Sequence, residues 1–253
     1  PSLFHRIYSV WNRHERVYSN NLISNGLPPF LEPIFFLLTL GFGLGKFVVD
    51  MGGIPYAQFL AGGITVSPAM FTASFECSYG TYIRLEFDKI YEGMLASPIT
   101  AKDLLLGEII FAGTKSFFFS ACVLVVISVF GLVSYPSALL VPFGGFLTGL
   151  MFAVLSLLVT AFVKTINHFN FYFTGVLTPL FFFSGIVFPI SSLPEKIRWI
   201  AEFSPLTHPT RLMRAFCINQ YSYDLLYSLL YIIVFIIIIG YLAIYKLEKR
   251  LIS

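Results

Sequence analysis

Charged residues are scarce in this chain: Asp, Glu, Lys and Arg together make up 11% of its 253 residues. Hydrophobic residues account for 57%, and the mean hydropathy is +0.82. Soluble globular domains carry roughly 25% charged residues, so this composition excludes a water-soluble core. The chain is therefore predicted to be a membrane protein.

The chain also lacks the residue clusters that catalytic and metal centres require. Its three cysteines lie far apart with no Cys-x-x-Cys spacing, and its four histidines are scattered. These spacings indicate neither a zinc site nor a disulfide framework. No HExxH, GxSxG or phosphate-loop motif occurs, and the basic residues form no patch suited to nucleic acid. We expect no catalytic residue, metal, cofactor or nucleic-acid partner in this chain.

Long apolar runs dominate what is present. Six of them lie at residues 29–49, 56–78, 104–131, 138–163, 169–190 and 225–245. Each is close to the ~20 residues with which a helix crosses ~30 Å of hydrocarbon. Backbone polar groups in lipid must pair within their own segment, so these runs are helices. The predicted fold is an all-α polytopic membrane protein, a single domain over 1–253 with six transmembrane helices.

Basic residues indicate the orientation of these helices. If the spans alternate from a cytoplasmic N-terminus, ten of the sixteen Lys and Arg residues fall in inner segments and five in outer ones. Lys and Arg are enriched on the cytoplasmic side of membrane proteins. The count favours both termini in the cytoplasm.

Residues 1–20 have the pattern of an amphipathic helix. Phe4, Ile7, Tyr8 and Trp11 recur at helical spacing, with arginines mostly on other faces. Such a helix is typical of the headgroup plane, where apolar burial and anionic lipid hold it. The alternative is a loosely ordered tail.

Two carboxylates fall within predicted spans, Glu32 in the first and Glu76 in the second. A charge in hydrocarbon costs at least ~2.5 kcal/mol on the insertion scale, so each must find a partner, face water or be protonated. Glu76 either serves translocation or pairs structurally with Arg84 or Lys115. In the same span Pro68 follows two glycines, which predicts a bent or broken helix.

The most polar interior stretch, residues 84–98, is predicted to be a short cytoplasmic helix. Asp88, Lys89 and Glu92 share one helical stripe, whereas Phe87, Ile90 and Met94 lie on another. The helix either rests on the membrane surface or docks into a groove of a partner.

Residues 191–222 are too polar to span a membrane and too apolar for a free loop. Apolar side chains, Trp199 and Leu206 among them, alternate with charged ones, and Pro205 splits the segment. Two short helices dipping into the outer leaflet fit this pattern, and they would form a lid. Residues 223–253 then form the sixth span and a cytoplasmic tail.

Several segments, in order along nearly the whole chain, resemble permeases of the ABC-2 type. They are Leu31-Glu32-Pro33, Gly41-Phe42-Gly43-Leu44-Gly45, Phe75-Glu76, Tyr91-Glu92-Gly93-Met94-Leu95, Gly107-Glu108, Thr178 to Pro189, and Pro205-Leu206-Thr207-His208. Within this family the chain is similar to the nodulation protein J group, whose cargo class is a lipo-oligosaccharide.

The resemblance implies a bacterial inner-membrane exporter subunit that pairs with itself and with two copies of a separate ATPase. ATP and Mg would bind to that ATPase. The helix predicted at 84–98 would act as a coupling helix, which carries the motion of the ATPase into spans two and five. The residues implied in coupling are Asp88, Lys89, Tyr91, Glu92 and Met94. Those implied in the pathway or gate are Glu32, Pro68, Glu76, Phe183, Ser184 and Phe188, and in the lid Trp199, Pro205 and Leu206.

Other functions stay open at this point. The cargo is a lipid-linked saccharide or similar amphiphile, or a hydrophobic drug exported by the same family. A channel or ion-coupled secondary transporter would use Glu32 and Glu76 as proton-carrying groups. A purely structural membrane subunit is the third class.

Overall fold

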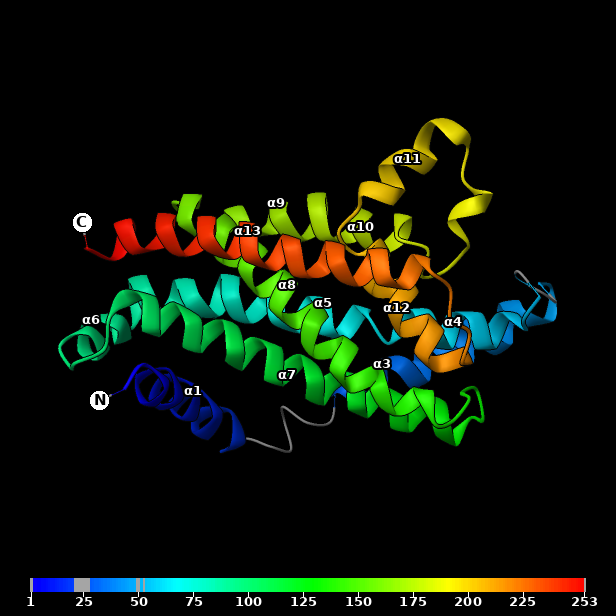
Figure 1. Ribbon diagram of the computed structural model, residues 1–253, viewed down its shortest axis with the longest axis horizontal. Coiled ribbons are helices and arrows are strands. Elements are labelled where there is room, and N and C mark those ends of the chain that lie inside the picture. Colours follow the sequence, from blue (N-terminus) through cyan, green and yellow to red (C-terminus); the bar gives the residue numbers. More distant parts are fainter. Residues whose placement is uncertain (1, 21–27, 49–50, 52, 253) are drawn as a thin grey trace.

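The computed structural model describes residues 2–20, 28–48, 51 and 53–252, and every helix or strand element assigned within these ranges is a helix. Long helices run side by side along the longest dimension of the molecule (Figure 1). The N-terminal helix α1 (Leu3–Ser19), α6 (Ile90–Leu95) and the C-terminal end of α13 (Asp224–Ile252) lie at one end, here called the terminal end. The opposite end carries α4, α11 and α12.

Four helices are long and apolar enough to cross a membrane: Pro28–Lys46, Ala101–Val129, Ser137–Phe162 and Asp224–Leu251. They coincide with the first, third, fourth and sixth predicted spans. The first consists of α3 (Pro28–Phe36), the π-helix η1 (Leu37–Gly43) and the 3-10 turn η2 (Leu44–Lys46). The third is α7 (Ala101–Val129), and the fourth is η5 (Ser137–Leu140) followed by α8 (Val141–Phe162).

The second predicted span is helical but interrupted, as its glycines and proline indicate. Helix α4 (Tyr56–Ile64) ends before Thr65, and α5 (Ser67–Phe75) starts with Pro68 in its first turn. The same rod continues through the π-helices η3 (Glu76–Gly80) and η4 (Ile83–Phe87). It is therefore longer than the predicted 56–78 and ends at Phe87, so it includes the first residues of the coupling helix predicted at 84–98.

Close packing of α7 against α8 forms the centre of the molecule. A Cβ atom added at Gly145 would lie 2.1 Å from the Ser120 hydroxyl, and one at Gly149 would lie 2.5 Å from Ser116. Neither distance is possible without moving a helix. The two glycines, four residues apart, therefore let the helices approach closely, as small residues do in membrane bundles.

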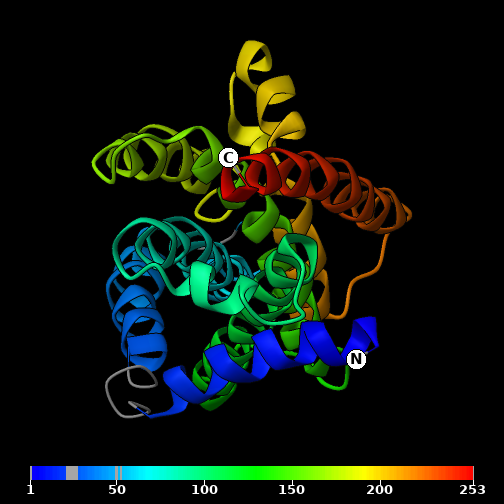
Figure 2. The same ribbon diagram turned by 90° about the vertical axis from the view of Figure 1, so that its left-hand side faces the viewer.

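The fifth predicted span is also divided, into α9 (His168–Tyr172), η6 (Phe173–Leu177) and α10 (Thr178–Phe183). This rod is shorter than the predicted 169–190, because Gly185 adopts a positive φ of 77° and turns the chain. Viewed from the terminal end, the rod stands to one side of the bundle (Figure 2). Several of its apolar side chains are exposed, among them Phe171, Phe182 and Phe183.

Three short helices follow: η7 (Ile190–Ser192), α11 (Glu195–Phe203) and α12 (Thr207–Ile218). Helix α12 is mostly buried and packs against α4 and α13, whereas α11 projects from the bundle (Figure 1). The chain divides at Ser204 and Pro205, as expected. The predicted pair of short helices is present, and their position in the outer leaflet stays a prediction.

Candidate functional site

The predicted coupling segment lies at the terminal end, but it is not one continuous helix. Lys89 adopts a left-handed backbone with φ of 50°, so the chain turns between η4 and α6. Asp88, Lys89 and Glu92 are nevertheless all exposed, with the Lys89 ammonium 3.7 Å from the Glu92 carboxylate. The prediction that the three charged residues share one stripe of a continuous helix was wrong. A turn at Lys89, and not helical periodicity, brings them to the same surface.

Tyr91, on the same short helix, points the other way. Its side chain is 1% exposed, and its hydroxyl donates a hydrogen bond to the Glu108 carboxylate on α7. Burial, and then the Glu108 charge, raise the pKa of Tyr91 well above its usual value, so the phenol stays neutral and can donate. Met94 is half-buried. Helix α6 thus joins a charged outer surface to a buried anion.

Glu108 is the centre of a buried group of polar residues. Its carboxylate also accepts a hydrogen bond from the Thr81 hydroxyl at 2.8 Å and lies 2.9 Å from Arg84 Nε. The His14 Nε2 atom of α1 is 3.5 Å away. Helices α1, α6 and α7 and the rod of span two therefore meet at one carboxylate.

Glu76 extends this group along span two. One of its carboxylate oxygens accepts from Arg84 at 2.7 Å, and the other accepts from Lys115 of α7 at 3.0 Å. The pairing with Arg84 or Lys115 that was one alternative for Glu76 is present, and it involves both cations. A part of Glu76 in translocation stays a prediction. The two carboxylates, two cations, Tyr91, Thr81 and His14 are called the polar cluster below. A buried charge is tolerated only when paired and hydrogen-bonded, and the cluster supplies one cation for each anion.

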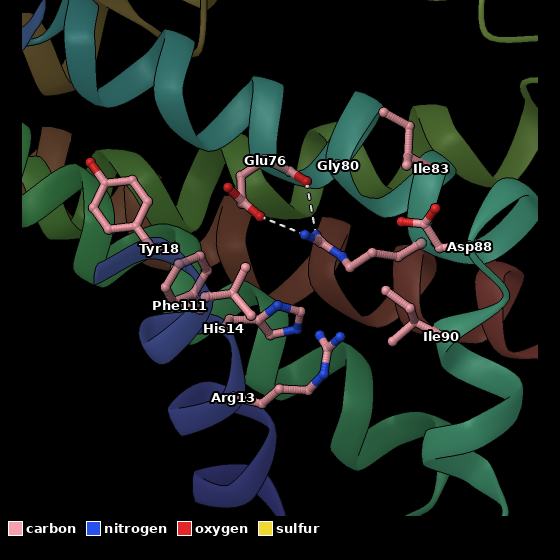
Figure 3. A pocket seen from close by; sticks show the side chains of 11 residues that line it. Arg13, His14, Tyr18, Glu76, Gly80, Ile83, Asp88, Ile90 and Phe111 are labelled. Atoms are coloured by element: carbon pink, nitrogen blue, oxygen red, sulfur yellow. Dashed lines mark hydrogen bonds and ion pairs between the residues drawn. The ribbon is translucent and has the colours of Figure 1, made fainter. Parts of the chain in front are cut away.

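A cavity of about 370 Å³ opens beside the polar cluster. Figure 3 shows side chains of α1 and of the span-two rod lining it together, with Arg13 and His14 on one side and Glu76 on the other. Asp88 and Ile90 line its edge next to α6. The cavity therefore lies where the N-terminal helix, the span-two rod and α6 come together.

The N-terminal helix is fixed to α7 by its polar face. Arg6 lies 2.9 Å from Asp103, and the Trp11 indole donates to the Thr114 hydroxyl at 3.1 Å. His14 is buried, which lowers its pKa to about 4 despite the nearby Glu108, so the imidazole is neutral at physiological pH. The N-terminal segment is helical, as predicted, and Phe4 and Tyr8 are exposed. Its place in the headgroup plane stays a prediction.

Sequence reasoning did not single out Glu108 or His14 as members of a site. Glu108 lies inside a long apolar run, seven residues before Lys115, so both fall on the same face of α7. That spacing was the available signal. His14 carried none, because its contact comes from the way α1 lies across α7.

The residues expected in the pathway are spread over the molecule. Pro68 is buried and Glu32 of α3 is exposed, and the two line one small pocket of about 10 Å³, which is separate from the cavity beside the polar cluster. Ser184 is buried, with its hydroxyl 3.2 Å from that of Ser204, and Phe188 is half-buried. Phe183 lines an apolar groove of about 650 Å³ between span five and α11.

The lid residues lie beside this groove. Trp199 is 60% exposed on α11, Leu206 is fully buried, and Pro205 is half-buried. The structure thus brings α11 and the end of span five together, and both lie far from the terminal end (Figure 1). A lid role for these residues stays a prediction.

Sequence comparison decides the family. Residues 5–218 match the ABC-2 type transporter family. The chain belongs to this family. Nodulation protein J of Sinorhizobium fredii is 33% identical over 245 residues, covering 97% of this chain and 94% of the relative. Nodulation protein J of Rhizobium leguminosarum bv. trifolii is 34% identical over 244 residues, covering 96% and 93%.

A more distant relative is the inner membrane transport permease YadH of Escherichia coli, 21% identical over 200 residues, with 79% of this chain and 78% of the relative covered. Members of the ABC-2 family are membrane subunits of ABC transporters. The ABC-2 chain described here is thus an integral membrane transporter permease. Within the residues that the structure describes, no three metal-ligating side chains gather.

Proposed function

We propose that this ABC-2 permease exports a lipid-linked saccharide or a similar amphiphile, driven by two copies of a separate ATPase that bind ATP and Mg. The cargo class is inferred from nodulation protein J, with which the chain shares about a third of its residues. The observation that carries the coupling role is the arrangement of α6. The charged residues at and just before this helix are exposed, and the hydroxyl of its buried residue Tyr91 donates a hydrogen bond to Glu108.

This arrangement suggests how motion passes through the subunit. An ATPase that contacts Asp88, Lys89 and Glu92 displaces α6, and Tyr91 moves with it. Glu108 then shifts relative to Arg84, and through Arg84 the displacement reaches the rod of span two. Since that rod is interrupted at Thr65 and Val66, its two halves can change their angle.

The transporter is proposed to be a homodimer with spans one and five at its interface. Support comes from the exposed apolar side chains of the fifth span and from the space around Gly43 and Gly45, where no atom lies closer than 3.7 Å to an added Cβ. A glycine with open space beside it lets a second helix approach closely. Both termini would be cytoplasmic in the inner membrane, with six spans and α11 and α12 at the outer face.

The test is a charge reversal on α6. In Glu92→Lys, co-purification of the ATPase should fall and ATP-driven export should be lost, while the permease still inserts and dimerises. Like-charge contact in place of attraction costs docking energy and slows association. The matched control is Glu195→Lys, the same change on an exposed residue of α11. Normal ATPase binding and export in Glu92→Lys would remove α6 from the mechanism.

An ion-coupled transporter is less well supported. Glu76, the carboxylate it would use within the span-two rod, contacts two cations that favour its charged form. A proton carrier must change its protonation state readily, which this pairing opposes.

A further inference from the structure

Helix α11 separates two hollows of opposite character at the end of the molecule that carries the lid. On one side lies the apolar groove of about 650 Å³, to which α11 contributes Ile197, Ile200 and Ala201. On the other lies a pocket of about 290 Å³, to which α11 contributes Arg198 and Glu202. The helix is amphipathic, with each face lining its own hollow.

The second pocket carries a positive charge that the protein does not fully balance. Three arginines and one carboxylate line it, and Arg211 pairs with Glu202. Arg198 donates to the backbone carbonyls of Ser191 and Leu193, at 2.8 and 3.2 Å. Within the described ranges, neither Arg198 nor Arg214 contacts a carboxylate in this pocket.

Arg214 is held especially firmly. Its guanidinium donates to the carbonyl oxygens of Phe59, Gly185 and Ile186 at 2.7 to 3.2 Å and lies 3.7 Å from the centre of the Phe59 ring. Carbonyl dipoles fix its position but do not cancel its charge. A fixed cation at the edge of a low-dielectric region attracts an anion more strongly than it would in water.

The two hollows meet at Ser184 and Ser204. Phe183 and Ser204 line the groove, Ser184 lines the charged pocket, and the two serine hydroxyls lie 3.2 Å apart. We infer that the groove and the pocket form one site for an amphiphile whose alkyl chain lies in the groove and whose anionic head group, a carboxylate, sulfate or phosphate, binds Arg198 and Arg214. This inference rests on the proposed export of an amphiphile, and it narrows the cargo to acidic head groups.

The test uses two matched probes, dodecyl glucuronide and dodecyl glucoside, each with a photoreactive diazirine in the same alkyl chain. The permease with its ATPase is reconstituted in phosphatidylcholine vesicles, and labelled peptides are mapped by mass spectrometry. The glucuronide should label residues 175–204 about tenfold more than the glucoside, the factor expected for a charge-assisted contact.

Variants separate charge from packing. Arg198→Gln should abolish the preference for the glucuronide, and Glu202→Gln should increase it, because the two changes shift the pocket charge in opposite directions. Lys196→Gln, on the same helix but outside the pocket, is the control and should label as the wild type does. Arg214 is left intact because its carbonyl contacts hold α12 in place.

Three results would overturn the inference. The first is equal labelling by both probes. The second is displacement of the glucuronide by phosphatidylglycerol at the same molar fraction in the vesicle, and the third is a disulfide between two Phe183→Cys copies that excludes the probe. The second would assign the site to a resident lipid, and the third would assign the groove to the dimer partner. If the preference holds but ATP drives no export, the proposed function fails and the site stands. If export proceeds without the preference, only the site fails.

Discussion

Tyr91→Phe removes a single oxygen atom and is the most direct test of the link between α6 and the polar cluster. The ring remains buried, so apolar packing is conserved, while Glu108 loses one of its donors. Hydrogen bonds to charged groups contribute about 1.5–3 kcal/mol, whereas bonds between helices in membranes average about 0.6 kcal/mol. Because the acceptor here is a buried carboxylate, we expect a loss near the lower end of the first range, about 1.5 kcal/mol in free energy of unfolding.

Tyr82→Phe provides a matched control. Tyr82 is 6% exposed, and its hydroxyl donates to the neutral backbone carbonyl of Lys164 at 2.9 Å. The same atom is removed, but no charge loses a donor, so about 0.6 kcal/mol is expected. Thermal or denaturant unfolding of both variants in detergent measures the difference.

Transport should separate the two variants further. If Tyr91 carries the motion of α6 to Glu108, export per ATP hydrolysed should fall several-fold in Tyr91→Phe while ATP hydrolysis by the bound partner continues. Tyr82→Phe should keep the wild-type ratio. The measurement is ATP-dependent uptake of cargo into inverted membrane vesicles with parallel phosphate release. If the two variants have equal stability and equal transport ratios, Tyr91 is a packing residue and the proposed coupling route is wrong.

Three further predictions concern the same end of the molecule. Glu76→Gln should retain more export and stability than Glu76→Leu, because the amide oxygen still accepts a hydrogen bond from one of the two neighbouring cations, Arg84 or Lys115, and leucine accepts none. Equal and complete loss of export by both folded variants would indicate a proton-carrying role. Gly107→Ala should destabilise the protein by about 1–3 kcal/mol, since the new Cβ would lie 2.6 Å from the Val10 Cβ, whereas Gly93→Ala should cause no such loss, because the space there is open. The pKa of His14 is about 4 in the folded protein against an ordinary 6.5, so between these pH values the unfolded chain binds one more proton than the folded one. The free energy of unfolding should therefore fall by up to about 3 kcal/mol as the pH drops from 6.5 to 4, and this fall should be absent in His14→Gln.

Much of the fold follows from local signals in the sequence. Four spans are long apolar runs, and the break in the second span follows from Gly62, Gly63 and Pro68. The pairing of Glu76 was also predictable, because a carboxylate in such a run must be compensated and two cations lay within reach. In each case a single physical requirement acts on residues close in sequence or in the same predicted helix.

The errors arise where the backbone departs from periodicity without a sequence marker. A left-handed residue is usually Gly, Asn or Asp, and the turn before α6 uses Lys89 instead. Helical spacing therefore predicted correctly that Asp88, Lys89 and Glu92 share a surface, but the backbone between them is a turn and not a continuous helix. Glu108 was passed over because its partners come from α1, α6 and span two, and no pattern within one segment can reveal a contact among four.

The length of α6 explains why the polar cluster and the exposed charges belong together. With six residues the helix is too short to be stable by itself in water, so its position depends on what its side chains contact. Tyr91 supplies a buried contact on one face, and Glu92, the next residue, points outward. A partner that moves Glu92 must therefore move Tyr91, because a helix this short has no other anchor of comparable burial. The displacement is then imposed on a carboxylate of α7 whose other contacts lie on α1 and span two, so it cannot remain local to the surface where the partner binds.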